Sequence, residues 1–204
     1  MGTLGIRQFA ARRDSQRGFT LVEMMIVVVI VGVLAGLAVY SVRRYMFASK
    51  TAEAGEMINS IRAAQEVYKG DAFEYLDVSG SNAVTDMGQF YPSTAPGNFK
   101  TVWGDSSTTI GKRWRALNVS ASGGVYFAYA CAAGGPNNTV DTYEIDGIWA
   151  GTPSAAIQNW PPASWAPSAW YVIKVVGNLS GGDKKQLWVT ASFTDQLFNN
   201  VDTE

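Results

Sequence analysis

The residue types that most often carry catalysis are scarce in this sequence. The 204-residue chain has no histidine and one cysteine, Cys131. It therefore has no imidazole to act as a general acid or base, no Ser–His or Cys–His pair, and no Cys/His set to hold zinc. One cysteine cannot form an internal disulfide, and because Cys131 stands in an apolar segment we expect a small buried thiol. The composition argues against an enzyme and predicts neither a cofactor nor a bound metal.

The carboxylate in the most unusual setting is that of Glu23. It is followed directly by residues 24–42, none of which carries a charge. A carboxylate in apolar surroundings protonates, is expelled or pairs with a cation, so a retained one predicts a cationic partner. A second interpretation is that Glu23 stands at the N-terminal end of a helix, where the positive end of the helix dipole stabilises an acidic side chain. The two interpretations are compatible.

The apolar run that follows Glu23 would position it. Residues 24–42 correspond to about 28 Å of helix, close to the hydrocarbon thickness of a bilayer. Gly32 and Gly36 would let two such helices approach closely, or would be weak points of about 1 kcal/mol each. Residues 1–18 carry four arginines and one aspartate, which predicts that this end stays cytoplasmic.

The segment Arg17-Gly18-Phe19-Thr20-Leu21-Val22-Glu23, between a basic leader and the apolar run, resembles the processing and assembly signal of type IV prepilins. The resemblance implies that a prepilin peptidase cuts between Gly18 and Phe19 and that the new Phe19 amine is methylated. It also implies that Glu23 pairs with the Phe19 amine of a neighbouring subunit and sets the axial register of a filament. Many family members have a proline where this chain has Tyr40, so no proline kink is expected here.

The helix is expected to continue beyond the membrane with one buried stripe. Apolar positions recur at three and four residues from Ala54 to Tyr68, which predicts packing against a sheet. Arg62 and Glu66 stand four residues apart and are expected to pair weakly. Gly70-Asp71 is the expected stop.

Strand signals follow an irregular connection over residues 71–112. In the first of the expected strands, residues 125–132, the side that carries the alanines is expected to face the helix. One long helix followed by strands predicts an α+β pilin fold, with the helix packed on a C-terminal antiparallel sheet. The expected strands are 125–132, 170–176 and 186–193, with weaker signals at 114–119 and 143–149.

Two loops have compositions that could form binding sites. Residues 177–183 contain one acid, Asp183, which is too few for calcium and predicts a metal-free turn. Trp160, Trp165 and Trp170 stand among prolines, where they either cover the sheet, which we favour, or form a surface contact for a glycan or partner.

We therefore expect a leader (1–18, removed), a transmembrane and filament-core helix (19–42), its amphipathic continuation (43–69) and a globular sheet domain (70–204). The resemblance implies a structural subunit of a type IV pilus-like filament for motility, adhesion or attachment. Its expected partners are copies of itself, the prepilin peptidase, the membrane assembly platform and, before assembly, the bilayer. The precursor is expected in the bacterial inner membrane with its domain periplasmic, and the product in an extracellular pilus.

Several alternatives share parts of this pattern. A minor pilin or a type II secretion pseudopilin would carry the same N-terminal signal. A membrane-anchored glycan-binding domain would use the tryptophan-rich loop, and a secreted soluble domain would begin near Val39. Nucleic acid is not an expected partner, because 16 basic residues nearly balance 17 acidic ones.

Overall fold

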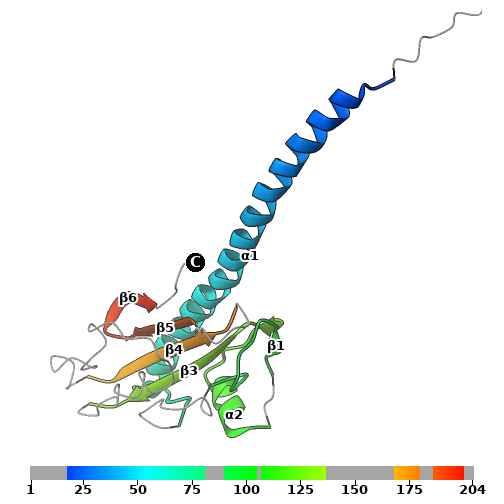
Figure 1. The fold of residues 1–204 in the computed structure, drawn as a ribbon. Coiled ribbons are helices and arrows are strands. Elements are labelled where there is room, and N and C mark those ends of the chain that lie inside the picture. Colours follow the sequence, from blue (N-terminus) through cyan, green and yellow to red (C-terminus); the bar gives the residue numbers. More distant parts are fainter. Residues whose placement is uncertain (1–17, 81–89, 105–106, 137–167, 180–185, 200–204) are drawn as a thin grey trace, which may run out of the picture. The chain divides into compact units, whose positions relative to one another are not determined.

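The computed structural model describes residues 18–80, 90–104, 107–136, 168–179 and 186–199 (Figure 1). The chain divides into two compact units, one that ends at Tyr45 and one that begins at Met46. The long helix α1 (Leu21–Ala72) starts in the first unit and ends in the second. All the strands and the second helix belong to the second unit.

The first unit contains the apolar half of α1. The helix is unbroken through Gly32, Gly36 and Tyr40. The hydroxyl of Ser41 donates a hydrogen bond to the Leu37 carbonyl at 3.1 Å, so this polar side chain is satisfied within its own helix. The large apolar side chains of this half are exposed on every side. The helix predicted for the apolar run is therefore confirmed, and Tyr40 does not interrupt it.

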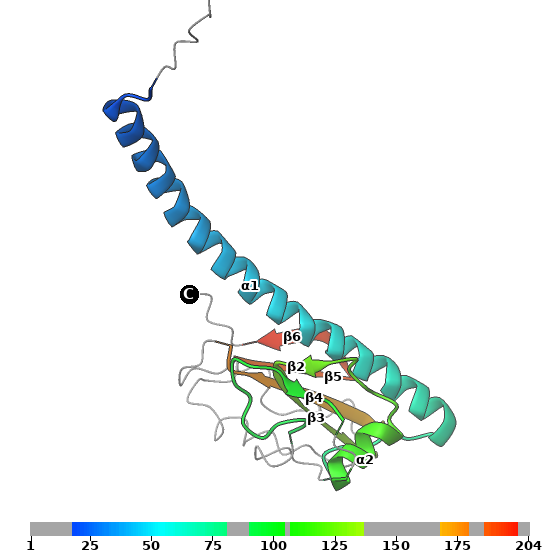
Figure 2. The ribbon, with the colours of Figure 1, turned by 90° about the vertical axis from the view of Figure 1, so that its right-hand side faces the viewer.

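A four-stranded antiparallel sheet dominates the second unit. Figure 2 shows the last turns of α1 lying across this sheet. The architecture confirms the predicted α+β class, with a long N-terminal helix and a C-terminal antiparallel sheet. In sheet order the strands are β3 (Phe127–Gly134), β4 (Trp170–Gly177), β5 (Gln186–Ala191) and β6 (Thr194–Asn199).

The buried stripe of α1 is the one that its spacing predicts. Its side chains pack in one core with alternate residues of β3, among them Phe127, Tyr129 and Cys131. The buried positions of the stripe are Ala54, Met57, Ile58, Ile61 and Gln65.

The side of β3 that faces this helix was predicted wrongly. The bulky residues, not the alanines, point into the core shared with α1. Ala128, Ala130 and Ala132 lie in a second core with Phe90 and Trp170. The reason is the volume of the side chains. The aromatic rings fill the space between helix and sheet, and the alanines leave room for the Trp170 indole on the other face of the sheet.

The segment 114–119 was predicted as a strand, but Trp114 belongs to the helix α2 (Thr109–Ala116). The Thr108 side chain caps this helix by accepting a hydrogen bond from Gly111 N at 3.0 Å. Trp114 and Leu117 are buried three residues apart, with exposed residues between them, which is a helical pattern. The weak strand predicted at 143–149 lies outside the described residues.

The connection between α1 and α2 is mostly irregular, as predicted, but it is tied to β3. Val78 N and Ser79 N both donate to the Cys131 carbonyl, at 3.1 and 3.0 Å. Tyr91 and Tyr129 form an isolated antiparallel bridge. Later in the connection, β1 (Thr101–Val102) pairs with β2 (Gly124–Val125). The predicted strand 186–193 ends earlier, and the chain turns at Ser192 and returns as β6.

Candidate functional site

The residues Gly18, Phe19 and Thr20 precede the first turn of α1. Gly18 is exposed, and a Cβ added there would meet no heavy atom within 4 Å. Phe19 is 78% exposed. The peptide bond between Gly18 and Phe19 therefore lies in a segment that no other described part of the chain covers.

Thr20 and Glu23 cap the helix reciprocally. The Thr20 hydroxyl accepts a hydrogen bond from Glu23 N at 3.2 Å, and Glu23 Oε2 accepts bonds from Thr20 N and Thr20 Oγ1, each at 3.0 Å. This is the capping box of a Thr-x-x-Glu sequence, in which two backbone donors of the first turn are satisfied. Sequence reasoning singled out Glu23 but missed Thr20, although the spacing of the two residues is itself the signal.

The capping box determines which part of Glu23 can meet another group. Both bonds that the carboxylate accepts go to Oε2, and among the described residues Oε1 accepts no hydrogen bond. Glu23 is exposed and stands at the N-terminal end of the helix, where a negative charge is favourable. The structure therefore supports the role of Glu23 at the helix dipole, and it leaves one carboxylate oxygen for a cation.

The surface that follows Glu23 is apolar. Of the helices in the described part of the chain, α1 is long and apolar enough to cross a membrane. A Cβ added at Gly32 or Gly36 would meet nothing within 4 Å, so no described part of the chain packs closely against either glycine. The surface at these two glycines is therefore open to the approach of another helix.

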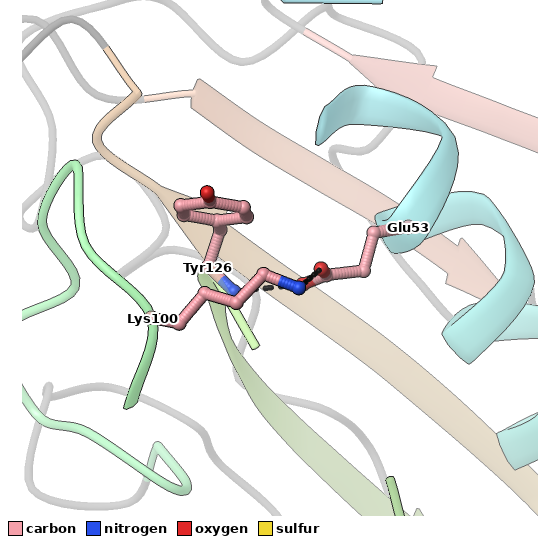
Figure 3. A network of polar contacts seen from close by, with 3 residues as sticks. All are labelled: Glu53, Lys100 and Tyr126. Carbon is pink, nitrogen blue, oxygen red and sulfur yellow. Dashed lines mark hydrogen bonds and ion pairs between the residues drawn. The ribbon is translucent and has the colours of Figure 1, made fainter. Parts of the chain in front are cut away.

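Polar contacts attach the amphipathic half of α1 to the rest of the second unit (Figure 3). Glu53 Oε1 accepts a hydrogen bond from Tyr126 N at 2.7 Å, and Glu53 Oε2 lies 3.3 Å from Lys100 Nζ. The ammonium groups of Lys50 and Lys100 lie 4.6 and 5.0 Å from the centroid of the Tyr126 ring. One carboxylate thus joins the helix to the chain just before β3.

Arg62 does not pair with Glu66 as expected. Its guanidinium donates to Thr190 Oγ1 and, at 2.7 Å, to the Thr194 carbonyl. Glu66 accepts a hydrogen bond from the Tyr75 hydroxyl at 2.9 Å instead. The prediction was wrong because the half-buried Arg62 side chain reaches oxygens of the sheet, whereas an exposed ion pair with Glu66 would contribute little.

The possible surface role of Trp170 is also incorrect. Trp170 is 0% exposed, and its ring atoms lie 2.4 Å from where a Cβ of Gly134 would stand. The indole therefore covers the sheet, which is the alternative that the sequence favoured. Trp160, Trp165 and Asp183 lie outside the described residues.

The described residues contain no arrangement typical of an active or metal site. No group of three or more possible ligands among His, Cys, Asp and Glu occurs within them. The Cys131 thiol is buried, and burial raises its pKa to about 12. The expectation of a small buried thiol is confirmed, because at neutral pH this group is neither ionised nor accessible.

Comparison with known families identifies the N-terminal segment. The prokaryotic N-terminal methylation motif matches residues 13–39. That range contains Gly18, Phe19 and Glu23, together with the two glycines of the apolar run.

Known proteins are similar over larger parts of the chain. Type II secretion system core protein G of Pseudomonas aeruginosa is 45% identical over 64 residues, which are 31% of this chain and 45% of that protein. Type IV major fimbrial protein FimA of Dichelobacter nodosus is 35% identical over 88 residues, which are 42% of this chain and 54% of that protein. Type II secretion system core protein G of Escherichia coli is 29% identical over 137 residues, or 67% of this chain and 92% of that protein.

The chain spans about half the length of the first two of these relatives. No solved structure matches it. The similarity therefore rests on sequence, and the family motif lies at residues 13–39.

Proposed function

Because the chain is a type IV pilin or prepilin-like protein, we propose that it is a structural subunit of an extracellular type IV pilus-like filament. The observation that carries this proposal is the methylation motif over residues 13–39, which runs into the apolar half of α1, where the large apolar side chains are exposed. Relatives of this chain are named as fimbrial and secretion proteins, not as enzymes. The subunit would serve in motility, adhesion or surface attachment.

The precursor is inserted in the inner membrane by the apolar half of α1, with its leader cytoplasmic and its sheet domain periplasmic. A prepilin peptidase then cuts between Gly18 and Phe19. The exposure of both residues and the absence of a Gly18 side chain support access of an enzyme to this bond. The new Phe19 amine is methylated, and the chain is passed to the membrane assembly platform.

Assembly pairs the Phe19 amine of one subunit with Glu23 of its neighbour. The free Oε1 of Glu23 supports this pairing, because an amine can bind there while Oε2 keeps its bonds to Thr20. In an apolar surrounding an unpaired charge costs several kcal/mol, so subunits stack only where the two charges meet. The open surfaces at Gly32 and Gly36 would then lie where neighbouring helices approach most closely.

Mass spectrometry of the mature N-terminus tests the processing step. We expect a chain that begins with N-methylated Phe19. A mature end near Val39, or an intact leader, would exclude the filament subunit.

Substitution of Glu23 tests the assembly step separately. Glu23→Ala should be processed normally but should form few filaments, whereas Glu56→Ala, which removes another exposed acid of α1, should assemble as the natural chain does. Normal filaments from Glu23→Ala would refute the pairing with Phe19.

A second candidate function is that of a type II secretion pseudopilin. The similarity to core protein G of Pseudomonas aeruginosa favours it, since that identity of 45% exceeds the 35% to the fimbrial protein. The abundance of the chain in sheared surface filaments separates the two roles. A major pilin dominates such a preparation, and a minor pilin or a pseudopilin does not.

A further inference from the structure

A small pocket opens in the second unit beside α2. Its volume is about 180 Å³, and its lining includes Tyr91, Trp103 and Trp114 together with the exposed polar residues Arg115 and Asn118. Pockets for drug-sized ligands measure roughly 300–1,000 Å³. This one therefore has room for about one six-membered ring and its substituents.

The aromatic residues of the pocket hold one another in place. The ring centroids of Trp103 lie 4.9 Å from Tyr91 and 5.4 Å from Trp114, both in edge-on arrangements. The Tyr91 hydroxyl accepts a hydrogen bond from Gly104 N at 3.0 Å, which fixes the backbone next to Trp103. Trp103 remains half-buried, so part of a rigid indole is open to the pocket. Such a surface suits the apolar C–H face of a flat ring.

Trp114, another lining residue, carries an unused hydrogen-bond donor. Trp114 is 1% exposed, and its indole Nε1 has no hydrogen-bond partner in the described part of the chain. Buried polar groups of this kind are rarely left unpaired, so the N–H of a residue that lines a pocket is a candidate donor to a ligand. A ligand with hydroxyl oxygens would accept this N–H.

The charge of the lining residues narrows the class of ligand that the pocket could bind. Among the lining residues that the structure describes, Arg115 is the one with a charged side chain. Its guanidinium is exposed and can donate two parallel hydrogen bonds to a carboxylate. The pocket therefore combines an aromatic platform, a buried N–H donor and a carboxylate-binding fork.

We propose that this pocket binds a single sugar ring that carries a carboxylate, as in the uronate units of acidic polysaccharides. The ring stacks on Trp103, a hydroxyl accepts the Trp114 indole N–H, and the carboxylate pairs with Arg115. Trp170 packs in the second core and is not one of the lining residues. The site adds a ligand to a filament subunit that needs none for assembly.

The test is a titration of the full chain in detergent micelles, with its tryptophan indole nitrogens labelled with ¹⁵N and observed by NMR. Sodium glucuronate is the probe and glucose is its neutral counterpart. We expect glucuronate to shift the Trp103 and Trp114 indole signals with a dissociation constant on the order of 1 mM, as suits so small a ligand. Trp103→Ala should weaken binding about tenfold.

Arg115→Ala should remove most of the preference for glucuronate over glucose, about tenfold, and because Arg115 is exposed the variant should fold. The matched controls are Lys112→Ala, a neighbouring exposed cation, and Phe99→Ala, an exposed ring outside the pocket; neither should change binding. Absence of shifts, binding that survives Trp103→Ala, or equal affinities for the two sugars would overturn the proposal.

Discussion

The side-chain amide of Gln65 pairs with the backbone of Leu76 as a second strand would. Gln65 Oε1 accepts a hydrogen bond from Leu76 N at 3.0 Å, and Gln65 Nε2 donates to the Leu76 carbonyl at 2.8 Å. The same Nε2 lies 3.1 Å from the sulfur of Cys131. A fully buried glutamine therefore joins α1, the chain that leaves it and strand β3.

Gln65→Leu should destabilise the second unit strongly. The leucine keeps the volume but leaves the Leu76 N–H and carbonyl without this partner, which costs about 2–4 kcal/mol for the two groups together. Chemical unfolding of the full chain in micelles measures the loss. Gln65→Glu, which keeps an acceptor for Leu76 N but replaces the amide donor with a second oxygen, should also destabilise, whereas Glu56→Gln on the exposed side of the helix should not. A stable Gln65→Leu variant would contradict this role.

The contact of Glu53 with Tyr126 should matter more than its contact with Lys100. Glu53→Leu removes the acceptor of Tyr126 N, which we expect to cost about 1–3 kcal/mol. Lys100→Met removes a partly exposed ion pair and should cost less than about 1 kcal/mol. Unfolding of the two variants and of the double variant gives both values and their coupling. Equal losses from the two single changes would contradict this order.

The elements that could be read from the sequence are those with a strong periodic pattern. The stripe from Ala54 to Gln65 repeats at three and four residues, and the strands at 170–176 and 186–193 are rich in β-formers, so their type followed from local preference. The face of β3 did not follow, because alternation separates two sides of a strand without saying which partner covers each. That choice depends on the volumes of the two cores.

The errors at Trp114 and Arg62 have the same origin. An aromatic residue is typical of strands, but the capping of α2 by Thr108 and the burial of Trp114 beside Tyr91 outweigh that preference. Arg62 reaches oxygens that are distant in sequence, and Glu53 accepts a hydrogen bond from the distant backbone nitrogen of Tyr126. Long polar side chains find their partners only after the sheet has formed. At the N-terminus, by contrast, Thr20 could have been identified from its spacing to Glu23 alone.

Burial of Cys131 predicts an alkaline loss of stability. Because burial raises the pKa of this thiol to about 12 in the folded chain, the unfolded chain releases the proton at lower pH. The unfolded state then binds fewer protons, so this contribution to stability is complete below the ordinary thiol pKa of about 8.5 and is lost as the pH rises toward 12, by at most about 1.4 kcal/mol per pH unit.

Unfolding curves between pH 8 and pH 11, measured for the natural chain and for Cys131→Ala, isolate this contribution from that of the tyrosines. The variant should lose stability less steeply over this range, although it is less stable at pH 8. Parallel pH profiles of the two proteins would show that Cys131 does not contribute.

The open surface at Gly36 should matter for assembly but not for the single chain. Gly36→Ala meets no neighbouring atom and should stabilise the isolated helix by about 1 kcal/mol. Gly36→Leu should reduce filament yield if helices approach one another at this position, whereas Ala35→Leu adds comparable bulk at the adjacent position and serves as the control. Electron microscopy of sheared filaments gives the yield. Equal yields from both leucine variants would exclude a special role for Gly36.

Thr20 should position Glu23 rather than bind the neighbouring subunit. Thr20→Val keeps the shape but removes the hydroxyl that Glu23 N and Oε2 both contact, which costs about 1 kcal/mol of helix capping. Hydrogen exchange at Glu23 N should therefore accelerate about fivefold, and filaments should form more slowly without being abolished, unlike those of Glu23→Ala. Thr20→Ser retains the hydroxyl and should restore both properties. If serine and valine behave alike at this position, the methyl group and not the cap is what assembly requires.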